Sequence, residues 1–184
     1  ELGYAVTAVD YTAHMLEQAR KNAKEYGQNP CFLEMDASAL TFSDASFDVV
    51  VSRNLTWNLP EPEKAYREWL RVLAEGGTLL VYDANWYGYL YDDAKRDAYE
   101  KDRLHTAELG VKDEYEGTDI DAMEAIARKA PLSGTMRPQW DEQVLKRLGT
   151  RKILCDEAVW KKVWSKEEQV NFSATPMFEI IAIK

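Results

Sequence analysis

Short apolar runs alternate with longer amphipathic stretches through the first half of the chain. A short apolar run is typical of a buried strand, and an amphipathic stretch is typical of a helix that covers it. The pattern predicts strands near residues 5–10, 31–35, 47–53 and 78–83, and helices near residues 13–26 and 62–74. Because the connections between them are short, this alternation favours an α/β fold with a doubly wound, mostly parallel sheet.

The pattern changes after Asn85. An aromatic start followed by interspersed acids and bases runs from residue 86 to about residue 138. Mixed charges of this kind predict helices with solvated faces, and the stretch is longer than an ordinary connection. We therefore expect a mostly helical insertion over the strand ends. A helix near residues 140–148 and strands near residues 151–156 and 177–183 should follow it.

Two acids stand where predicted strands end. Asp10 closes the first apolar run, and Asp36 directly follows the second. In a doubly wound sheet, ligands bind at the carboxyl ends of the strands, and an acid there can accept hydrogen bonds from both hydroxyls of a ribose. Asp10 is therefore a candidate nucleoside-binding residue. The structural alternatives are a helix cap for Asp10 and a turn that bonds its own backbone for Asp36.

Three segments carry a resemblance to a known family, in the right order and spacing. They are residues 10–23 (DYTAHMLEQARKNA), 32–51 (FLEMDASALTFSDASFDVVV) and 71–81 (RVLAEGGTLLV). Together they resemble the class I S-adenosylmethionine-dependent methyltransferases of the type 11 pattern. The resemblance implies a Rossmann-like sheet whose last strand is antiparallel and lies beside the strand predicted at residues 78–83.

The resemblance also implies a cofactor and the residues that bind it. The cofactor would be S-adenosylmethionine, and the product S-adenosylhomocysteine. Asp10 would bind the ribose, Asp36 would accept the adenine amino group, and the amide of Ala37 would meet a ring nitrogen. Tyr11 and Met15 would flank the adenosine, although Met15 suits the core equally well.

The family's first strand and its glycine-rich turn have no counterpart in these residues and would lie before Glu1. We therefore expect the chain to lack its natural beginning, which would leave the cofactor site within residues 1–184 incomplete. The chain should form a single methyltransferase domain in which residues 86–138 are a lid or substrate-binding insertion.

Polar and aromatic residues after the strand near 47–53 are candidates for the methyl-transfer site. Methyltransferases place residues between cofactor and acceptor at this position. Arg53 and Asn54 could contact the cofactor, and Trp57 could contact the substrate, although packing explains each of them about as well. Asn54 is also a weak catalytic candidate. His105, in the insertion, is the other, because an imidazole can act as a general base.

The insertion and its flanks supply the candidate acceptor pocket. Aromatic side chains can enclose a flat or cationic acceptor, and they can equally form the core of a lid. Arg137 could pair with an acceptor carboxylate. The full candidate set at this position is Asn85, Trp86, Tyr87, Tyr91 and Arg137.

Charge and composition limit the partners. The formal net charge is -9 with no basic run, which argues against a nucleic-acid partner. No apolar run is long enough to cross a bilayer, so we expect no membrane partner. Cys31 and Cys155 lack metal-ligand spacing and are expected as buried thiols, which favours a cytoplasmic location. A metal is not expected either, because Arg53 stands where a metal site beside Asp83 would need an acid.

The resulting hypothesis is a methyltransferase that acts on an oxygen or nitrogen of a small-molecule acceptor. The methyl donor is already activated by its positive sulfur, so holding both reactants in line while excluding water can account for most of the catalysis. Two alternatives remain open. One is an NAD(P)-dependent Rossmann oxidoreductase, whose second strand also ends in an acid. The other is a non-catalytic nucleoside-binding or interaction module.

Overall fold

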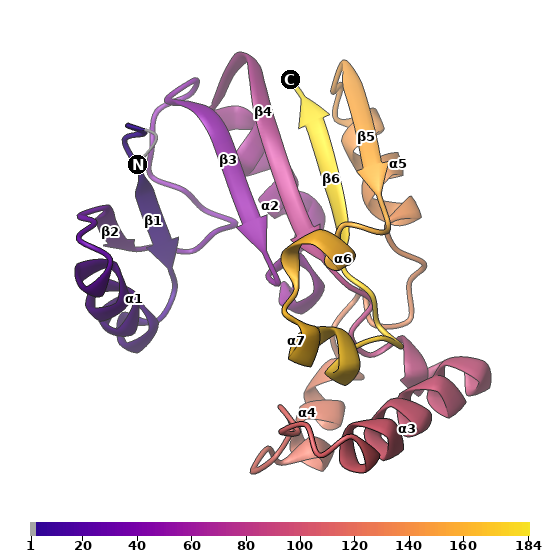
Figure 1. Cartoon of the computed structure of the whole chain (residues 1–184). Helices are drawn as coiled ribbons and strands as arrows, with labels where there is room; N and C mark the ends of the chain where they lie inside the picture. Colours follow the sequence, from indigo (N-terminus) through magenta and orange to yellow (C-terminus); the bar gives the residue numbers. More distant parts are fainter. Residues whose placement is uncertain (1–2) are drawn as a thin grey trace.

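The computed structural model describes residues 3–184 as an α/β protein with two β-sheets (Figure 1). The smaller sheet pairs β1 (Thr7–Asp10) with β2 (Cys31–Glu34) in parallel. Helix α1 (Ala13–Glu25) connects these two strands and buries Leu16. Strand, helix and parallel strand thus follow the order that the sequence predicts, although β1 begins at Thr7.

The larger sheet has four strands in the order β3-β4-β6-β5. Strands β3 (Phe47–Arg53) and β4 (Leu73–Asp83) are parallel, and helix α2 (Pro62–Val72) connects them. Strand β6 (Phe178–Ile183) lies antiparallel between β4 and β5 (Lys152–Asp156). The expected antiparallel last strand beside β4 is therefore confirmed.

The sheet is not continuous across the described residues, which differs from the single sheet that the sequence suggested. No ladder joins β1 to β3 in residues 3–184, so each of these strands has one unpaired edge. Figure 1 shows β1, β2 and α1 standing apart from the larger sheet. The only covalent connection between the two parts is the loop from β2 to β3, and this loop carries Asp36.

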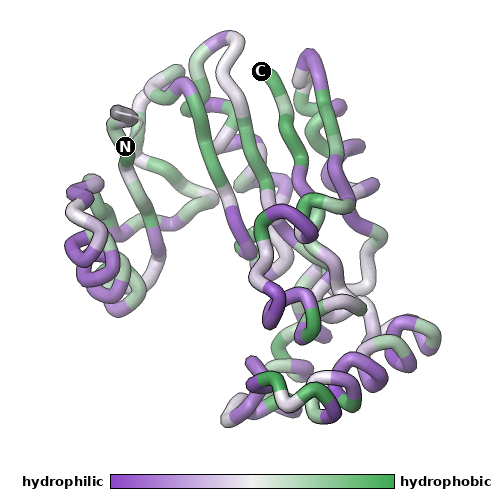
Figure 2. The backbone as a smooth tube through the Cα atoms, in the orientation of Figure 1, coloured by the Kyte–Doolittle hydropathy of each residue, from purple (hydrophilic) through white to green (hydrophobic). Residues whose placement is uncertain are grey.

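Helices α2 and α5 (Gln139–Arg147) cover one face of the larger sheet and form the main core with it (Figure 1). Side chains alternate along β4 and β6, so every second residue faces these helices. Leu79, Val81 and Ile180 are fully buried there. The opposite face is more open: Val51 is 60% exposed. Figure 2 shows the apolar stretches concentrated in the strands.

Helix α2 ends earlier than the sequence predicted because Leu73 already pairs with Phe47 of β3. A glycine pair then shapes the beginning of β4. Gly76 has a φ of +76°, which disfavours other residues. At Gly77, an added Cβ would stand 2.8 Å from the carbonyl oxygen of Ala74. Both positions thus require glycine where the chain turns from the helix into the sheet.

The stretch after β4 is mostly helical, as predicted. It contains the short 3-10 helix η2 (Gly88–Leu90), the helix α3 (Asp93–Glu108) and the helix α4 (Ile120–Ala127). Two further short helices, α6 (Trp160–Val163) and α7 (Lys166–Asn171), lie between β5 and β6. The side chain of Asp102 in α3 accepts hydrogen bonds from Ser173 and from the amide of Ala174, which follow α7. Residues far apart in the sequence are thereby joined beyond the carboxyl end of β4.

Cys31 and Cys155 are both exposed residues, so the prediction of two buried thiols is wrong. Cys31 begins the edge strand β2, and Cys155 lies in the outer strand β5. Their flanking apolar residues suggested burial, but an outer strand leaves much of its surface open to solvent. Burial is nevertheless partial at Cys155, where it raises the pKa of the thiol to about 12.

Replacing Leu79 with Ala tests the core. Leu79 is fully buried, so Leu79→Ala should lower the free energy of unfolding by about 2–5 kcal/mol, through lost burial and a residual cavity. The matched control is Leu154→Ala in β5, where the side chain is 48% exposed and the expected loss is below about 1 kcal/mol. Chemical denaturation measures both losses, and equal losses would contradict the described core.

Candidate functional site

Two acidic turns with the same construction lie at the carboxyl ends of β1 and β2. Oδ1 of Asp10 accepts hydrogen bonds from the amide and hydroxyl of Thr12, at 2.8 and 2.6 Å. Oδ1 of Asp36 accepts the same pair from Ser38, at 2.7 and 2.8 Å. Asp36 therefore does bond the backbone of its own turn, as its structural alternative proposed. Asp10 forms the same kind of turn and is not the cap of α1, because Thr12 occupies the N-cap position. In the described part of the chain, Oδ2 of each acid has no hydrogen-bond partner.

The two turns lie at the same edge of the small sheet. Asp10 pairs with Glu34 in the parallel register, and the amide of Met35 donates to the carbonyl oxygen of Asp10. Asp36 is exposed, and its hydrogen bonds from Ser38 lower the pKa of its carboxyl group. Each of the two carboxylates thus keeps one free oxygen at this end of the sheet, an arrangement that can accept donors from a ribose and from a base.

The residues beside Asp10 also face solvent. Tyr11 is 77% exposed and Met15 is 56% exposed, whereas Leu16 supplies the buried contact of α1. Of the two uses considered for Met15, the structure therefore leaves it outside the core. Both side chains could cover an adenosine bound at this edge.

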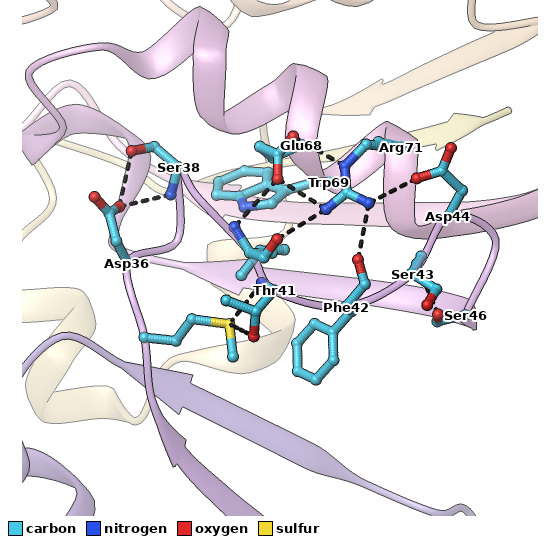
Figure 3. Close-up of polar contacts among 12 residues, drawn as sticks. Asp36, Ser38, Thr41, Phe42, Ser43, Asp44, Ser46, Glu68, Trp69 and Arg71 are labelled. Atoms are coloured by element: carbon cyan, nitrogen blue, oxygen red, sulfur yellow. Dashed lines mark hydrogen bonds and ion pairs between the residues drawn. The ribbon is translucent and has the colours of Figure 1, made fainter.

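The loop that follows Asp36 is fastened to α2 by three side chains (Figure 3). The indole nitrogen of Trp69 donates to the carbonyl oxygen of Ala37 at 2.9 Å. Arg71 donates to the carbonyl oxygens of Leu40 and Phe42, and Glu68 accepts from the amide of Leu40. Sequence reasoning missed these contacts. The only signal available was that Arg71 begins one of the segments that resemble the family.

The segment after β3 turns sharply at Asn54, which has a φ of +52°. Its amide donates to the carbonyl oxygen of Tyr82, so the turn follows the end of β4. Arg53 points toward α7, where it stands 3.8 Å from Glu168. Asn54 thus remains at the strand end predicted for it, while Arg53 has an ion-pair partner in the later part of the chain.

A buried ion network occupies the end of β4. The guanidinium of Arg137 donates to Asp83 at 2.9 Å and to both carboxylate oxygens of Asp141, at 2.9 and 2.7 Å. The side chains of Arg137, Asp83 and Asp141 are completely buried. Tyr66 of α2 donates to Asp141 at 2.6 Å, and burial raises the pKa of this tyrosine.

This network changes the interpretation of Arg137. The sequence suggested an acceptor carboxylate as its partner, but the structure supplies two carboxylates from the chain itself. Asp83 also accepts from the amide of Trp57 at 3.0 Å. Burial raises the pKa of Asp83, although the charge of Arg137 opposes this. The network therefore joins the two ends of the insertion to the 3-10 helix η1 (Thr56–Asn58) that follows β3.

The aromatic candidates pack against one another. The ring of Trp57 lies 5.2 Å from that of Tyr87, which in turn contacts Tyr89. Trp86 contacts Trp164 and Phe172, but its indole nitrogen is buried without a hydrogen-bond partner among the described residues. The structure thus brings Trp57 and Tyr87 together and directs Trp86 toward the segment around α7.

The remaining candidates lie farther out. Tyr91 is exposed, and its hydroxyl donates to the carbonyl oxygen of Arg128. His105 is on the exposed surface of α3, and its Nδ1 stands 3.9 Å from the exposed carboxylate of Glu108. This exposed position is typical of a surface histidine and does not indicate a catalytic role.

A cavity of about 210 Å³ opens between the two ends of the insertion and the beginning of β6. Its wall includes Asn85, Lys95 and Phe178. Oδ1 of Asn85 is buried and has no hydrogen-bond partner among residues 3–184. Of the predicted acceptor residues, Asn85 and Arg137 line this cavity.

No group of three or more His, Cys, Asp or Glu residues within residues 3–184 is arranged to hold a metal ion. No helix in this range combines the length and apolar character needed to cross a membrane.

Comparison with known sequences gives a consistent match in the first half of the chain. Residues 1–81 match the family described as "Methyltransferase domain". The chain is 39% identical over 79 residues to a phosphatidylethanolamine N-methyltransferase of Cereibacter sphaeroides, covering 42% of this chain and 39% of the relative. It is 42% identical over 81 residues to a demethylmenaquinone methyltransferase of Thermus thermophilus, covering 44% and 37%. The match thus spans about two fifths of these curated relatives.

Comparison with solved structures extends the likeness to the whole fold. A phosphoethanolamine N-methyltransferase of Haemonchus contortus, in complex with phosphomonomethylethanolamine and S-adenosylhomocysteine, has a TM-score of 0.61. The match covers 99% of this chain and 44% of that one, at 15% sequence identity. Such a distant likeness supports the fold alone.

Removing the buried guanidinium tests the ion network. Arg137→Met leaves two buried carboxylates uncompensated, so the free energy of unfolding should fall by about 3–5 kcal/mol. The matched control is Arg151→Met, which breaks an exposed ion pair with Glu75 and should cost less than about 1 kcal/mol. Urea denaturation at neutral pH compares the two variants. A loss at Arg137 no larger than at Arg151 would show that the network contributes little to stability.

Proposed function

We propose that the protein transfers a methyl group from S-adenosylmethionine to a small-molecule acceptor, because residues 1–81 match the methyltransferase domain family. The observation that carries the proposal is the pair of acidic turns at the ends of β1 and β2. Each presents one carboxylate oxygen that the protein itself leaves unbonded in the described residues. The family uses S-adenosylmethionine, and these two turns fit its nucleoside.

In the proposed complex, Oδ2 of Asp10 accepts from the ribose hydroxyls and Oδ2 of Asp36 accepts from the adenine amino group. The amide of Ala37 donates to a ring nitrogen. Tyr11 and Met15 flank the adenosine, since both are exposed beside Asp10. The lowered pKa of Asp36 favours its ionised carboxylate, in which both oxygens act only as acceptors.

The bound cofactor would supply a methyl group already activated by a positive sulfur. What remains for the protein is to hold the acceptor in line and to exclude water. Asn54 stands at the end of β3 and could orient the acceptor, and Trp57 with Tyr87 could close one side of it. His105 is a weaker candidate because it lies exposed on α3.

The proposed acceptor is a small molecule methylated on oxygen or nitrogen. The cavity beside Asn85 supports a small acceptor, because its volume suits few heavy atoms and its wall offers an unbonded amide oxygen. A relative named as an N-methyltransferase supports nitrogen. We further propose that residues 86–138 form one domain with the rest of the chain and act as the lid of this acceptor site.

Ligand binding should distinguish the cofactor. We expect S-adenosylhomocysteine to bind the full-length protein and NAD to bind it weakly or not at all. Asp10→Ala should reduce S-adenosylhomocysteine affinity by roughly 1.5–3 kcal/mol, because the ribose loses charge-assisted hydrogen bonds. The control is Glu75→Ala, which removes an exposed carboxylate that pairs with Arg151, outside the loop after β2. Calorimetry measures the binding of both ligands to the wild-type protein and of S-adenosylhomocysteine to both variants. Tight NAD binding, or an unchanged S-adenosylhomocysteine affinity in Asp10→Ala, would refute the assignment.

Hydrogen exchange should reveal the lid. A lid must open for ligand exchange, so amides of α3 and α4 should exchange faster than those of β4 in the free protein. Adding S-adenosylhomocysteine with a candidate acceptor should slow exchange in α3 and α4, while β4 stays unchanged. Equal protection of the insertion and β4 in both states would mean that residues 86–138 are a fixed part of the fold.

A further inference from the structure

Arg71 is bonded more completely than a surface arginine usually is. Its Nε and one terminal nitrogen donate to Glu68, at 3.0 and 2.9 Å. The other terminal nitrogen donates to the carbonyl oxygen of Phe42 at 2.8 Å and to Asp44 at 2.7 Å. The fifth donor goes to the carbonyl oxygen of Leu40 at 2.9 Å. A guanidinium has five N–H donors, so every one of them is used.

Most of these bonds go to one loop. The loop of residues 36–44 follows β2, and its backbone cannot bond within a sheet there. Arg71 donates to the carbonyl oxygens of Leu40 and Phe42, while Glu68 accepts from the amide of Leu40 at 3.1 Å. The indole nitrogen of Trp69 donates to the carbonyl oxygen of Ala37. Figure 3 shows these side chains of α2 converging on the loop from one side, with Asp36 at its far end.

The two acidic turns stand on a small sheet that no strand pairing joins to the larger one among residues 3–184. Helix α2 belongs to the larger sheet, because its core residues pack against β4 and β6. The bonds from α2 to the loop therefore determine where Asp36 and Ala37 stand relative to the rest of the molecule. A planar fork fixes direction as well as distance, which a single ammonium cannot do.

We propose that Arg71 is a positioning residue for the adenine of the cofactor. It acts with Trp69 through the loop of residues 36–44, so that Oδ2 of Asp36 and the amide of Ala37 face the base together. This inference rests on the proposed function. If it holds, α2 determines the selectivity of the protein for adenine over other bases, although α2 touches no part of the nucleoside in that arrangement.

The experiment compares two ligands on the full-length protein by calorimetry. S-adenosylhomocysteine offers the amino group that Asp36 would accept, and S-inosylhomocysteine replaces this group with a carbonyl oxygen. The wild-type protein should bind S-adenosylhomocysteine about tenfold more tightly than S-inosylhomocysteine, because the carbonyl oxygen of the second ligand leaves Asp36 without a hydrogen-bond donor. Thermal melting of each variant monitors folding separately.

The decisive variant is Arg71→Lys, which keeps the charge but cannot reach both loop carbonyls and the two acids. We expect its affinity for S-adenosylhomocysteine to fall about tenfold and its preference between the two ligands to shrink toward one. The matched control is Arg67→Met on the same helix, where the guanidinium pairs only with Glu63 among the described residues. This control should keep both the affinity and the preference within about twofold.

If Arg71→Lys loses affinity but keeps the full preference, or if Arg67→Met changes the preference equally, Arg71 supports the fold only and the inference is overturned. If the wild-type protein binds S-adenosylhomocysteine without preferring it, reading of the base by Asp36 is wrong and the inference falls with it. If the wild-type protein binds neither ligand, the proposed function itself fails.

Discussion

One buried guanidinium holds the carboxyl end of the larger sheet together. Arg137 reaches Asp83 at the end of β4 and Asp141 in α5, and Asp141 in turn holds Tyr66 of α2. Three elements of the core therefore share one buried, hydrogen-bonded ionic centre. A buried charge without a partner would be costly, so separating Arg137 from Asp83 and Asp141 would destabilise the fold.

The same centre determines where the insertion can begin and end. Asp83 is the last residue of β4, and Arg137 stands just before α5. Because their ion pair fixes both ends of the intervening stretch, motion within it can occur only between these anchors. The amide of Trp57 donates to the same carboxylate of Asp83. Trp57, a candidate contact of the acceptor, and the beginning of the insertion are therefore held by one side chain.

Periodicity and strand-end position were enough to predict most of the elements and to place Asp10 and Asp36 at strand ends. Local rules apply there: Asp10 and Asp36 each bond a hydroxyl residue two positions later, and an apolar run precedes both turns. The partners of Arg137 could not be predicted in this way, because Asp83 is 54 residues distant in the sequence and only the fold brings it near. Likewise, nothing local indicates that Arg71 reaches across to residues 40–44, or that β1 and β3 remain unpaired with each other.

The hydroxyl partners of the two acids have a thermodynamic consequence. Thr12 and Ser38 each hold one carboxylate oxygen with two hydrogen bonds, so the side-chain rotamers of Asp10 and Asp36 are already selected before any ligand arrives. The conformational entropy of these side chains is therefore lost during folding and not during association. A ligand that meets the free oxygens encounters a prearranged pair of acceptors, and more of its interaction energy is retained as affinity.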